Sequence, residues 1–83
     1  MNETKCRKVN IRGSIIRLDQ FLKWVGITST GGHAKAIIQD GHVFVNGRIE
    51  THRGRQLQTG DVVNIDSIEG VAYEVMGGNG DAH

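Results

Sequence analysis

The sequence predicts an α+β domain in which two helices pack on a small, mostly antiparallel β-sheet. Between Arg17 and Gly41, apolar residues recur with the helical period of about 3.6. Beyond Gly41 the period changes to about two, which is typical of strands that bury one face. Asn46 and Gly47 follow directly, and this pair is the strongest short signal for a β-hairpin because its turn requires a positive φ at both central positions.

The 83 residues are expected to form one domain, because a chain of this length buries only about 60 to 65% of its unfolded surface. We assign the domain to residues 8–76 and expect flexible tails at residues 1–7 and 77–83. Apolar residues make up 37% of the chain, which supports a core, yet no apolar run is long enough to cross a bilayer. The lone Cys6 excludes an internal disulfide, and the lack of a secretory signal predicts a cytoplasmic protein.

The first strand is predicted over residues 8–12, where apolar and polar residues alternate before Gly13. The first helix is predicted over residues 17–25, because its apolar residues fall at positions i, i+3, i+4 and i+7. Gly26 is expected to end this helix, since glycine readily adopts the left-handed conformation that follows a helix.

The second helix is predicted to begin after Ser29 or Thr30, because either side chain can cap its N-terminus. Gly41 fits the position just after the end of this helix. The remaining strands follow the alternating pattern and are expected over residues 43–45, 48–51, 62–66 and 71–75, with turns between them.

Charge is distributed unevenly along the chain. Residues 1–55 hold all ten Lys and Arg residues and four acidic residues, for a net charge of +6. Residues 56–83 hold five acidic residues and no Lys or Arg, for a net charge of −5. This asymmetry predicts that one face binds a polyanion. The alternative is that both signs intermingle once the chain has folded.

Four short motifs occur in order: Arg-Leu-Asp-x-x-Leu at residues 17–22, the helical segment 34–38, Gly-His-Val-Phe-Val-Asn-Gly at 41–47, and Gly-Asp at 60–61. As an ordered set they resemble the alpha-L RNA-binding module, the domain named for the fourth protein of the small ribosomal subunit. The segments Ser29 to Lys35 and Glu50 to Arg55 are similar to those of the small, free-standing bacterial members of this family.

The resemblance implies an alpha-L fold in which the two helices and adjoining loops form a face that binds structured RNA, often ribosomal RNA. Residues of this sequence that match or adjoin that face are the candidate RNA-binding residues: Arg17, Lys23, Thr30, Gly31, Gly32, His33, Lys35, Arg48, Arg53 and Arg55.

The start of the second helix suits a phosphate, because the first backbone N–H groups of a helix lack intrahelical partners and glycines allow a close approach. Ordinary capping and a tight turn between the helices explain the same residues. Gly31 stands where the commoner family pattern has an Arg directly after the capping residue. Lys35, one turn into the helix, matches a position that is usually basic.

Arg48, Arg53 and Arg55 offer three guanidinium groups within eight residues, and each can hold a phosphate in a forked geometry. Arg17 and Trp24 are seven positions apart on the first helix, so a cation and a ring could contact a phosphate and a base. The simpler interpretation is that Trp24 seals the edge of the core.

Lys23, the other cation of the first helix, also has two interpretations. Lys23 lies four residues after Asp19 and could form a surface ion pair with that carboxylate. Its position facing solvent would equally allow it to contact a phosphate.

The sequence favours neither a metal site nor an enzyme, and we expect no cofactor. The single cysteine and the four histidines lack the paired spacing of a zinc site, and the carboxylates are scattered. Residues 26–31 carry two glycines at P-loop spacing, but Gly32 and His33 follow in place of the required lysine and hydroxyl, and a helix precedes them.

The expected partner is structured RNA, possibly in a ribosomal subunit, and neither a membrane nor a small-molecule substrate is expected. One rival interpretation is a protein-interaction module that docks on a ribosomal or ribosome-assembly protein through the acidic C-terminal segment or a sheet edge. A second rival is a small hydrolase or nuclease that uses His33, His42 or His52.

Overall fold

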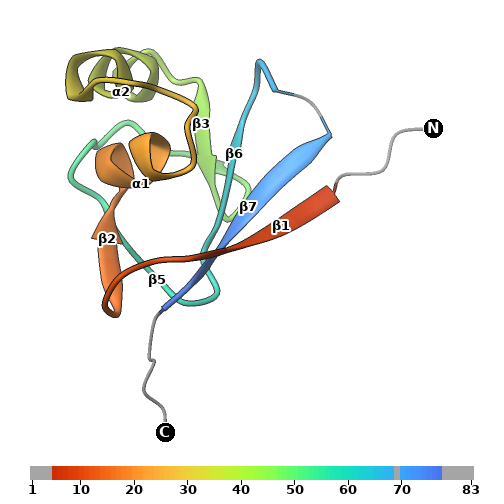
Figure 1. The fold of residues 1–83 in the computed structure, drawn as a ribbon. Coiled ribbons are helices and arrows are strands. Elements are labelled where there is room, and N and C mark those ends of the chain that lie inside the picture. The colour runs from red at the N-terminus through yellow and green to blue at the C-terminus, as the bar shows by residue number, and fades with distance from the viewer. Residues whose placement is uncertain (1–4, 69, 78–83) are drawn as a thin grey trace, which may run out of the picture.

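A computed structural model describes residues 5–68 and 70–77 and contains two helices and a mixed β-sheet (Figure 1). The described elements, in chain order, are β1 (Lys5–Asn10), β2 (Ile15–Arg17), α1 (Leu18–Trp24), α2 (Gly31–Gln39), β3 (Val43–Val45), β4 (Arg48–Ile49), β5 (Gln56–Gln58), β6 (Val62–Ile65) and β7 (Val71–Met76). No helix in these residues is long and apolar enough to span a membrane. The two helices and the β-strands confirm the predicted α+β class.

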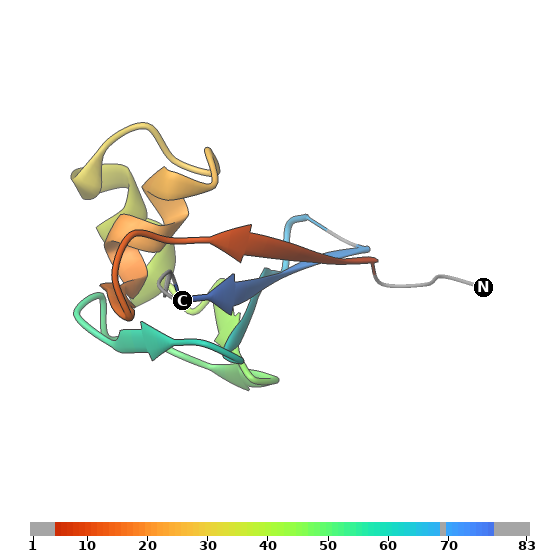
Figure 2. The ribbon, with the colours of Figure 1, turned by 60° about the horizontal axis from the view of Figure 1, so that its bottom comes forward.

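The main sheet has five strands in the order β1-β7-β6-β3-β4. Its pairs are antiparallel except for β1 and β7, which run parallel with Lys5 beside Val71 and Asn10 beside Met76. The prediction of a mostly antiparallel sheet is therefore confirmed. Figure 2 shows β1 and β7 extending together away from the end of the molecule that carries the helices.

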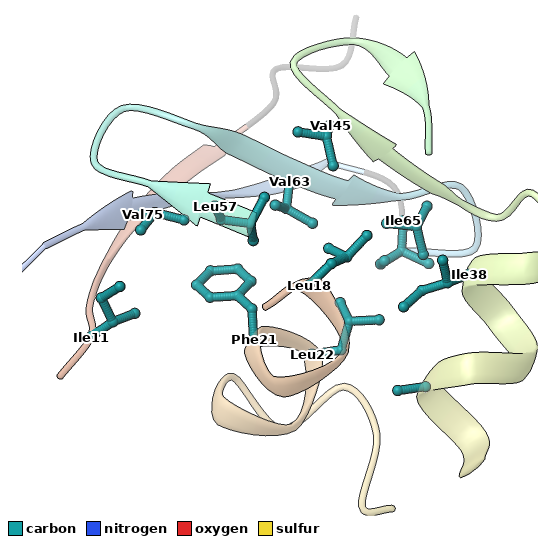
Figure 3. Close-up of a cluster of buried hydrophobic side chains, with 12 residues drawn as sticks. Ile11, Leu18, Phe21, Leu22, Ile38, Val45, Leu57, Val63, Ile65 and Val75 are labelled. Carbon is teal, nitrogen blue, oxygen red and sulfur yellow. The ribbon is translucent and has the colours of Figure 1, made fainter. Parts of the chain in front are cut away.

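The hydrophobic core lies between the two helices and the strands, as Figure 3 shows. Every described element except β1, β2 and β4 contributes at least one buried apolar side chain to it. Full burial of a large side chain such as Phe21 stabilises the fold by about 1.5–3 kcal/mol. The core residues are Ile11, Leu18, Phe21, Leu22, Ala34, Ile38, Val43, Val45, Leu57, Val63, Ile65 and Val75.

Both helices begin and end close to the predicted positions. The Thr30 side chain accepts a hydrogen bond from the His33 backbone N–H at 3.1 Å and so caps α2, one of the two caps predicted. Gly26 and Gly41 follow the C-terminal ends of α1 and α2, and each has a φ of 84°. This left-handed conformation suits glycine because it has no Cβ.

Two features of the N-terminal region differ from the predictions. β1 begins at Lys5, so the predicted tail of residues 1–7 is too long: residues 5–7 pair with β7. Ile15–Arg17 forms β2, which pairs with β5 in a separate two-stranded sheet that the sequence analysis did not predict. The partners of these strands lie far along the chain, so no local pattern could identify them.

At the other end, the predicted tail of residues 77–83 lies outside the described residues except for Gly77. The backbone N–H of Gly77 donates a hydrogen bond to Thr59 Oγ1 at 2.6 Å. A Cβ at Gly77 would lie 2.5 Å from the same oxygen, so glycine is required by this close approach. Residue 77 is therefore part of the folded domain.

The Asn46–Gly47 hairpin turn joins β3 to β4 with φ values of 53° and 84°, as predicted. The Asn46 side chain also ties this turn to the start of β6. Its amide nitrogen Nδ2 donates to Asp61 Oδ1 at 3.0 Å, and its Oδ1 accepts from the Val62 backbone N–H at 2.9 Å. Asn46 thus serves both the turn conformation and the contact between two turns.

Two substitutions at Asn46 separate the contribution of its backbone conformation from that of its side-chain hydrogen bonds. Asn46→Gly keeps the positive φ but removes both side-chain hydrogen bonds, and we expect it to lower the free energy of unfolding by about 1 kcal/mol. Asn46→Ala also imposes a residue that disfavours positive φ, and we expect a loss of about 2 kcal/mol. Urea unfolding measures both values, and equal losses would contradict the role of the backbone conformation.

Candidate nucleic-acid interface

The loop between β4 and β5 covers the N-terminus of α1. The backbone N–H of Leu18 donates to the Arg55 carbonyl oxygen at 2.8 Å, and the N–H of Asp19 donates to the Arg53 carbonyl oxygen at 3.1 Å. The first N–H groups of a helix have no partners within the helix, so the loop supplies them. The predicted residues Arg53 and Arg55 are therefore fixed relative to α1 by their own backbone.

Glu50 anchors the same loop from its first residue. Its Oε1 accepts a hydrogen bond from Arg55 Nη1 at 2.6 Å, and its Oε2 lies 3.2 Å from the His52 backbone nitrogen and 3.1 Å from His52 Nδ1. The Glu50 side chain is 14% exposed. Its backbone N–H also donates to the Val43 carbonyl oxygen at 2.9 Å, which joins the loop to β3.

The surroundings of Glu50 have opposing effects on its pKa. Burial raises the pKa of the carboxyl, but hydrogen bonds from Arg55 and His52 lower it by more, so the pKa of Glu50 lies below its ordinary value. The carboxylate is therefore charged at neutral pH and holds the Arg55 guanidinium in place.

The loop and the C-terminal end of α2 together line an open depression of about 590 Å³. Gln39 contributes the helix side of this depression, and residues 50–55 contribute the loop side. Lys35 is exposed and precedes Gln39 by four residues, so the two side chains lie on the same face of α2. Lys35 therefore lies one helical turn before the α2 residue that lines the depression, and Arg53 lines it from the loop.

Two of the predicted cations are held by carboxylates. Arg17 Nη2 lies 2.7 Å from Asp19 Oδ2, and the Asp19 side chain is only 6% exposed. Asp19 thus pairs with Arg17, not with Lys23 as one of the two alternatives had it. Arg55 is held by Glu50, as described above. A guanidinium has five N–H donors, so both arginines retain donors beyond those that the carboxylates occupy.

The other four predicted cations are exposed and form no ion pair within residues 5–68 and 70–77: Lys23, Lys35, Arg48 and Arg53. Arg48 lies on the edge strand β4, beside the hairpin turn, and does not line the depression. Lys23 lies in the last turn of α1, whereas the loop covers the first turn. Of these four cations, Arg53 lines the depression, Lys35 lies one helical turn before Gln39, and Lys23 and Arg48 do not line it.

Thr30, Gly31, Gly32 and His33 form the first turn of α2, at the opposite end from Gln39. A Cβ at Gly31 or Gly32 would meet no atom within 4 Å. Packing within the domain therefore does not require glycine at either position.

His42 and His52 each contact a carboxylate. His52 bonds to Glu50, and His42 Nδ1 lies 3.1 Å from Asp66 Oδ2. That hydrogen bond and the charge of Asp66 raise the pKa of His42. In the part of the chain that the structure describes, no three His, Cys, Asp or Glu side chains gather as a metal ion would need.

The sequence analysis did not identify Gln39 and Glu50 as residues that form this site. No periodic pattern marks Gln39 as lining a depression, because its partner loop follows more than ten residues later. Glu50 was visible as the only acid near three arginines, and this isolation was the available signal of an ion pair.

Glu50→Gln tests the anchoring of the loop. We expect the free energy of unfolding to fall by about 1–3 kcal/mol at neutral pH, because Arg55 and His52 would then donate to a neutral side chain instead of a carboxylate. The pKa of Glu50 is lowered in the folded state, so its stabilisation is present above its ordinary pKa of about 4.5 and is lost as the pH falls through the folded value. Urea unfolding of both proteins between neutral and acidic pH should show their difference shrinking below about pH 4.5, and a constant difference would contradict the assignment.

Comparison with known proteins agrees with the resemblance noted in the sequence. The S4 domain family matches residues 9–76 of the chain. The chain is also similar to the "Probable ribosome maturation protein RlbA" of Bacillus subtilis (strain 168), with 40% identity over 60 residues that cover 72% of this chain and 84% of the relative. The match extends from β1 to the end of β7. The chain therefore belongs to the S4 domain family.

Proposed function

We propose that this protein is a non-enzymatic RNA-binding module that recognises structured RNA, most directly ribosomal RNA, through phosphate contacts and shape. S4 domains typically bind RNA, and the similar Bacillus subtilis protein is named as a probable ribosome maturation protein. These two findings support a role at the ribosome or during its assembly, and hence in the cytoplasm.

The observation that carries the proposal is the surface formed by Lys35, Gln39 and Arg53. Both cations are exposed and form no ion pair among the described residues. Arg53 lines the open depression, and Lys35 lies one helical turn before Gln39, which lines its other side. Arg55 lines the same depression and is held by Glu50, while Arg17, directly before α1, is held by Asp19. The combination of free and fixed cations suits the irregular phosphate positions of a folded RNA.

The binding free energy would come chiefly from the release of counterions as Lys and Arg side chains neutralise phosphates. Phosphate contacts orient a protein on a nucleic acid without reading its sequence. The loop of residues 50–55 is held by α1 and by Glu50, so its cations need little ordering when RNA binds. Selectivity would therefore follow the shape of the RNA.

The arrangement of polar residues supports binding and not chemistry. Catalysis needs an activated nucleophile, or an acid and a base, facing a common substrate position. In this site the Glu50 carboxylate is occupied by Arg55 and His52, and the Asp19 carboxylate is occupied by Arg17. Each group serves to hold the loop or a cation.

The salt dependence of binding tests the proposed surface. The double variant Lys35→Ala/Arg53→Ala should bind a fluorescently labelled ribosomal RNA hairpin more weakly, and the slope of log K against log salt concentration should fall by about 1.5 units. Fluorescence anisotropy at several salt concentrations measures both quantities.

The matched control is Lys5→Ala/Arg7→Ala, which removes the same two side-chain types from exposed positions in the first half of β1. Its slope should change by much less than that of the first variant. Equal changes in the two variants would show that net charge, and not the surface of α2 and the loop, governs binding.

Restoring the cation that the commoner family pattern has at residue 31 gives a test in the opposite direction. Gly31→Arg should fold normally, because its Cβ meets no atom within 4 Å and arginine favours a helix more than glycine does. We expect tighter RNA binding and a salt slope that rises by a little under one unit. An unchanged slope, measured by the same anisotropy titration, would place the start of α2 outside the contact surface.

The identity of the RNA can be tested in cells by crosslinking the tagged protein and sequencing the bound RNA. Enrichment of one structured ribosomal site in the wild type, with its loss in Lys35→Ala/Arg53→Ala, would support the proposal. Diffuse recovery of RNA by both proteins would favour the rival in which the domain docks on a ribosomal or assembly protein.

A further inference from the structure

Trp24, the single tryptophan of the chain, is 48% exposed although it ends a helix whose other large apolar side chains are buried. An indole is among the costliest side chains to leave in water, because full burial would remove a large apolar area from solvent. Trp24 therefore does not simply seal the core, which was the simpler of the two interpretations of the sequence.

The edge of the Trp24 ring is held in place by β1. Its Nε1–H donates a hydrogen bond to the Asn10 carbonyl oxygen at 2.8 Å. The Ile11 N–H of the same peptide group donates to Met76 in β7, so the Asn10 carbonyl points the other way, to the outer edge of the sheet. The N–H group lies in the plane of the indole, so this bond holds the edge of the ring and restricts its rotation.

Exposed cations lie next to both ends of this hydrogen bond. Lys23 precedes Trp24, and Arg12 follows Asn10 by two residues. Neither side chain forms an ion pair with any other described residue. Residues 5–25 contain six Lys and Arg residues and a single acid, Asp19, which is buried and paired with Arg17. Lys23 and Arg12, which form no ion pair among the described residues, are therefore cations close in the chain to the two residues that this hydrogen bond joins.

We propose that Trp24 is a stacking platform for an unpaired RNA base, with Lys23 and Arg12 contacting the phosphates on either side of that nucleotide. An indole offers a flat surface to any base, and stacking on aromatic side chains is a common way for proteins to hold unpaired nucleotides. This inference rests on the proposed RNA-binding function and adds the class of RNA: a structured RNA with at least one unpaired base.

A polyanion fits this surface better than a protein partner does. A protein partner would have to cover three separate exposed groups, two of which are cations that form no ion pair among the described residues. The bond from Trp24 also occupies the outward carbonyl of Asn10, so at this point an added strand could not use that carbonyl. A nucleotide supplies both a flat ring and the negative charge that these residues match.

The intrinsic fluorescence of Trp24 offers a direct test, because no other tryptophan contributes to the signal. The two probes are a labelled RNA hairpin with an unpaired internal loop and a hairpin of equal length whose stem is fully paired. Both are closed by the same compact terminal loop whose bases stack on one another, so only the internal loop offers an accessible unpaired base. We expect the first RNA to quench Trp24 fluorescence and the second to bind, as anisotropy shows, without comparable quenching.

Substitutions give an independent measurement. Trp24→Ala should weaken binding of the looped hairpin by about tenfold and leave the paired hairpin nearly unaffected. Trp24→Phe retains a ring and should recover most of the affinity, while it removes the bond to Asn10. Urea unfolding of both variants reveals any loss of stability, and the wild-type quenching experiment does not depend on either variant folding.

The outcomes separate this inference from the proposed function. If both hairpins bind equally and neither quenches the fluorescence, RNA binding stands and the stacking platform is overturned. If neither RNA binds, the proposed function fails and this inference fails with it. Quenching by ribosomal proteins freed of RNA, without quenching by either hairpin, would make Trp24 a protein contact and would also overturn the inference.

Discussion

The arrangement of the candidate interface depends on the contact between the loop of residues 50–55 and the first turn of α1. Two loop carbonyl groups accept the hydrogen bonds of the helix N-terminus, and Glu50 holds the loop in the conformation that allows this. An unpartnered N-terminal turn would cost free energy wherever solvent is excluded. The loop therefore accepts the hydrogen bonds of N–H groups that have no partner within the helix. The helix in turn fixes the position of Arg53 and Arg55.

The charges of the domain divide into two groups with different tasks. Asp19 and Glu50 are largely buried, and each neutralises one arginine, so those pairs contribute mainly to the structure. The cations without such partners lie at the surface, where their solvation is nearly complete in the free protein. A chain with a net charge of only +1 can therefore keep unpaired cations at its surface. The acidic residues of the C-terminal third do not face these cations in any ion pair that the described residues form.

Two surfaces of the domain would then contact RNA in different ways. The surface of α2 and the loop offers Lys35 and Arg53 to phosphates, which favours any RNA of suitable shape. The end of α1 and the edge of β1 offer the ring of Trp24, which suits an unpaired base. A folded RNA that presents both features at the right separation would be selected over a plain duplex, and no base would need to be read by hydrogen bonds.

Much of the fold and part of the site could be predicted from the sequence, because their causes lie within a few residues of one another. The cap at Thr30, the turn at Asn46 and Gly47, and the apolar period of both helices are local properties. The exposed position of Lys35 on α2 follows from the same helical period. The family resemblance also rests on short motifs, and it is confirmed over residues 9–76.

What the sequence determined by itself is therefore the set of local elements, the class of fold and the family. Only the tertiary structure decided which cations are free, because burial makes Asp19 and Glu50 the partners of particular arginines. It also paired β2 with β5 and brought Asn10 to Trp24, 14 residues away. Contacts between distant segments form where packing brings them together, and no periodic pattern along the chain records them.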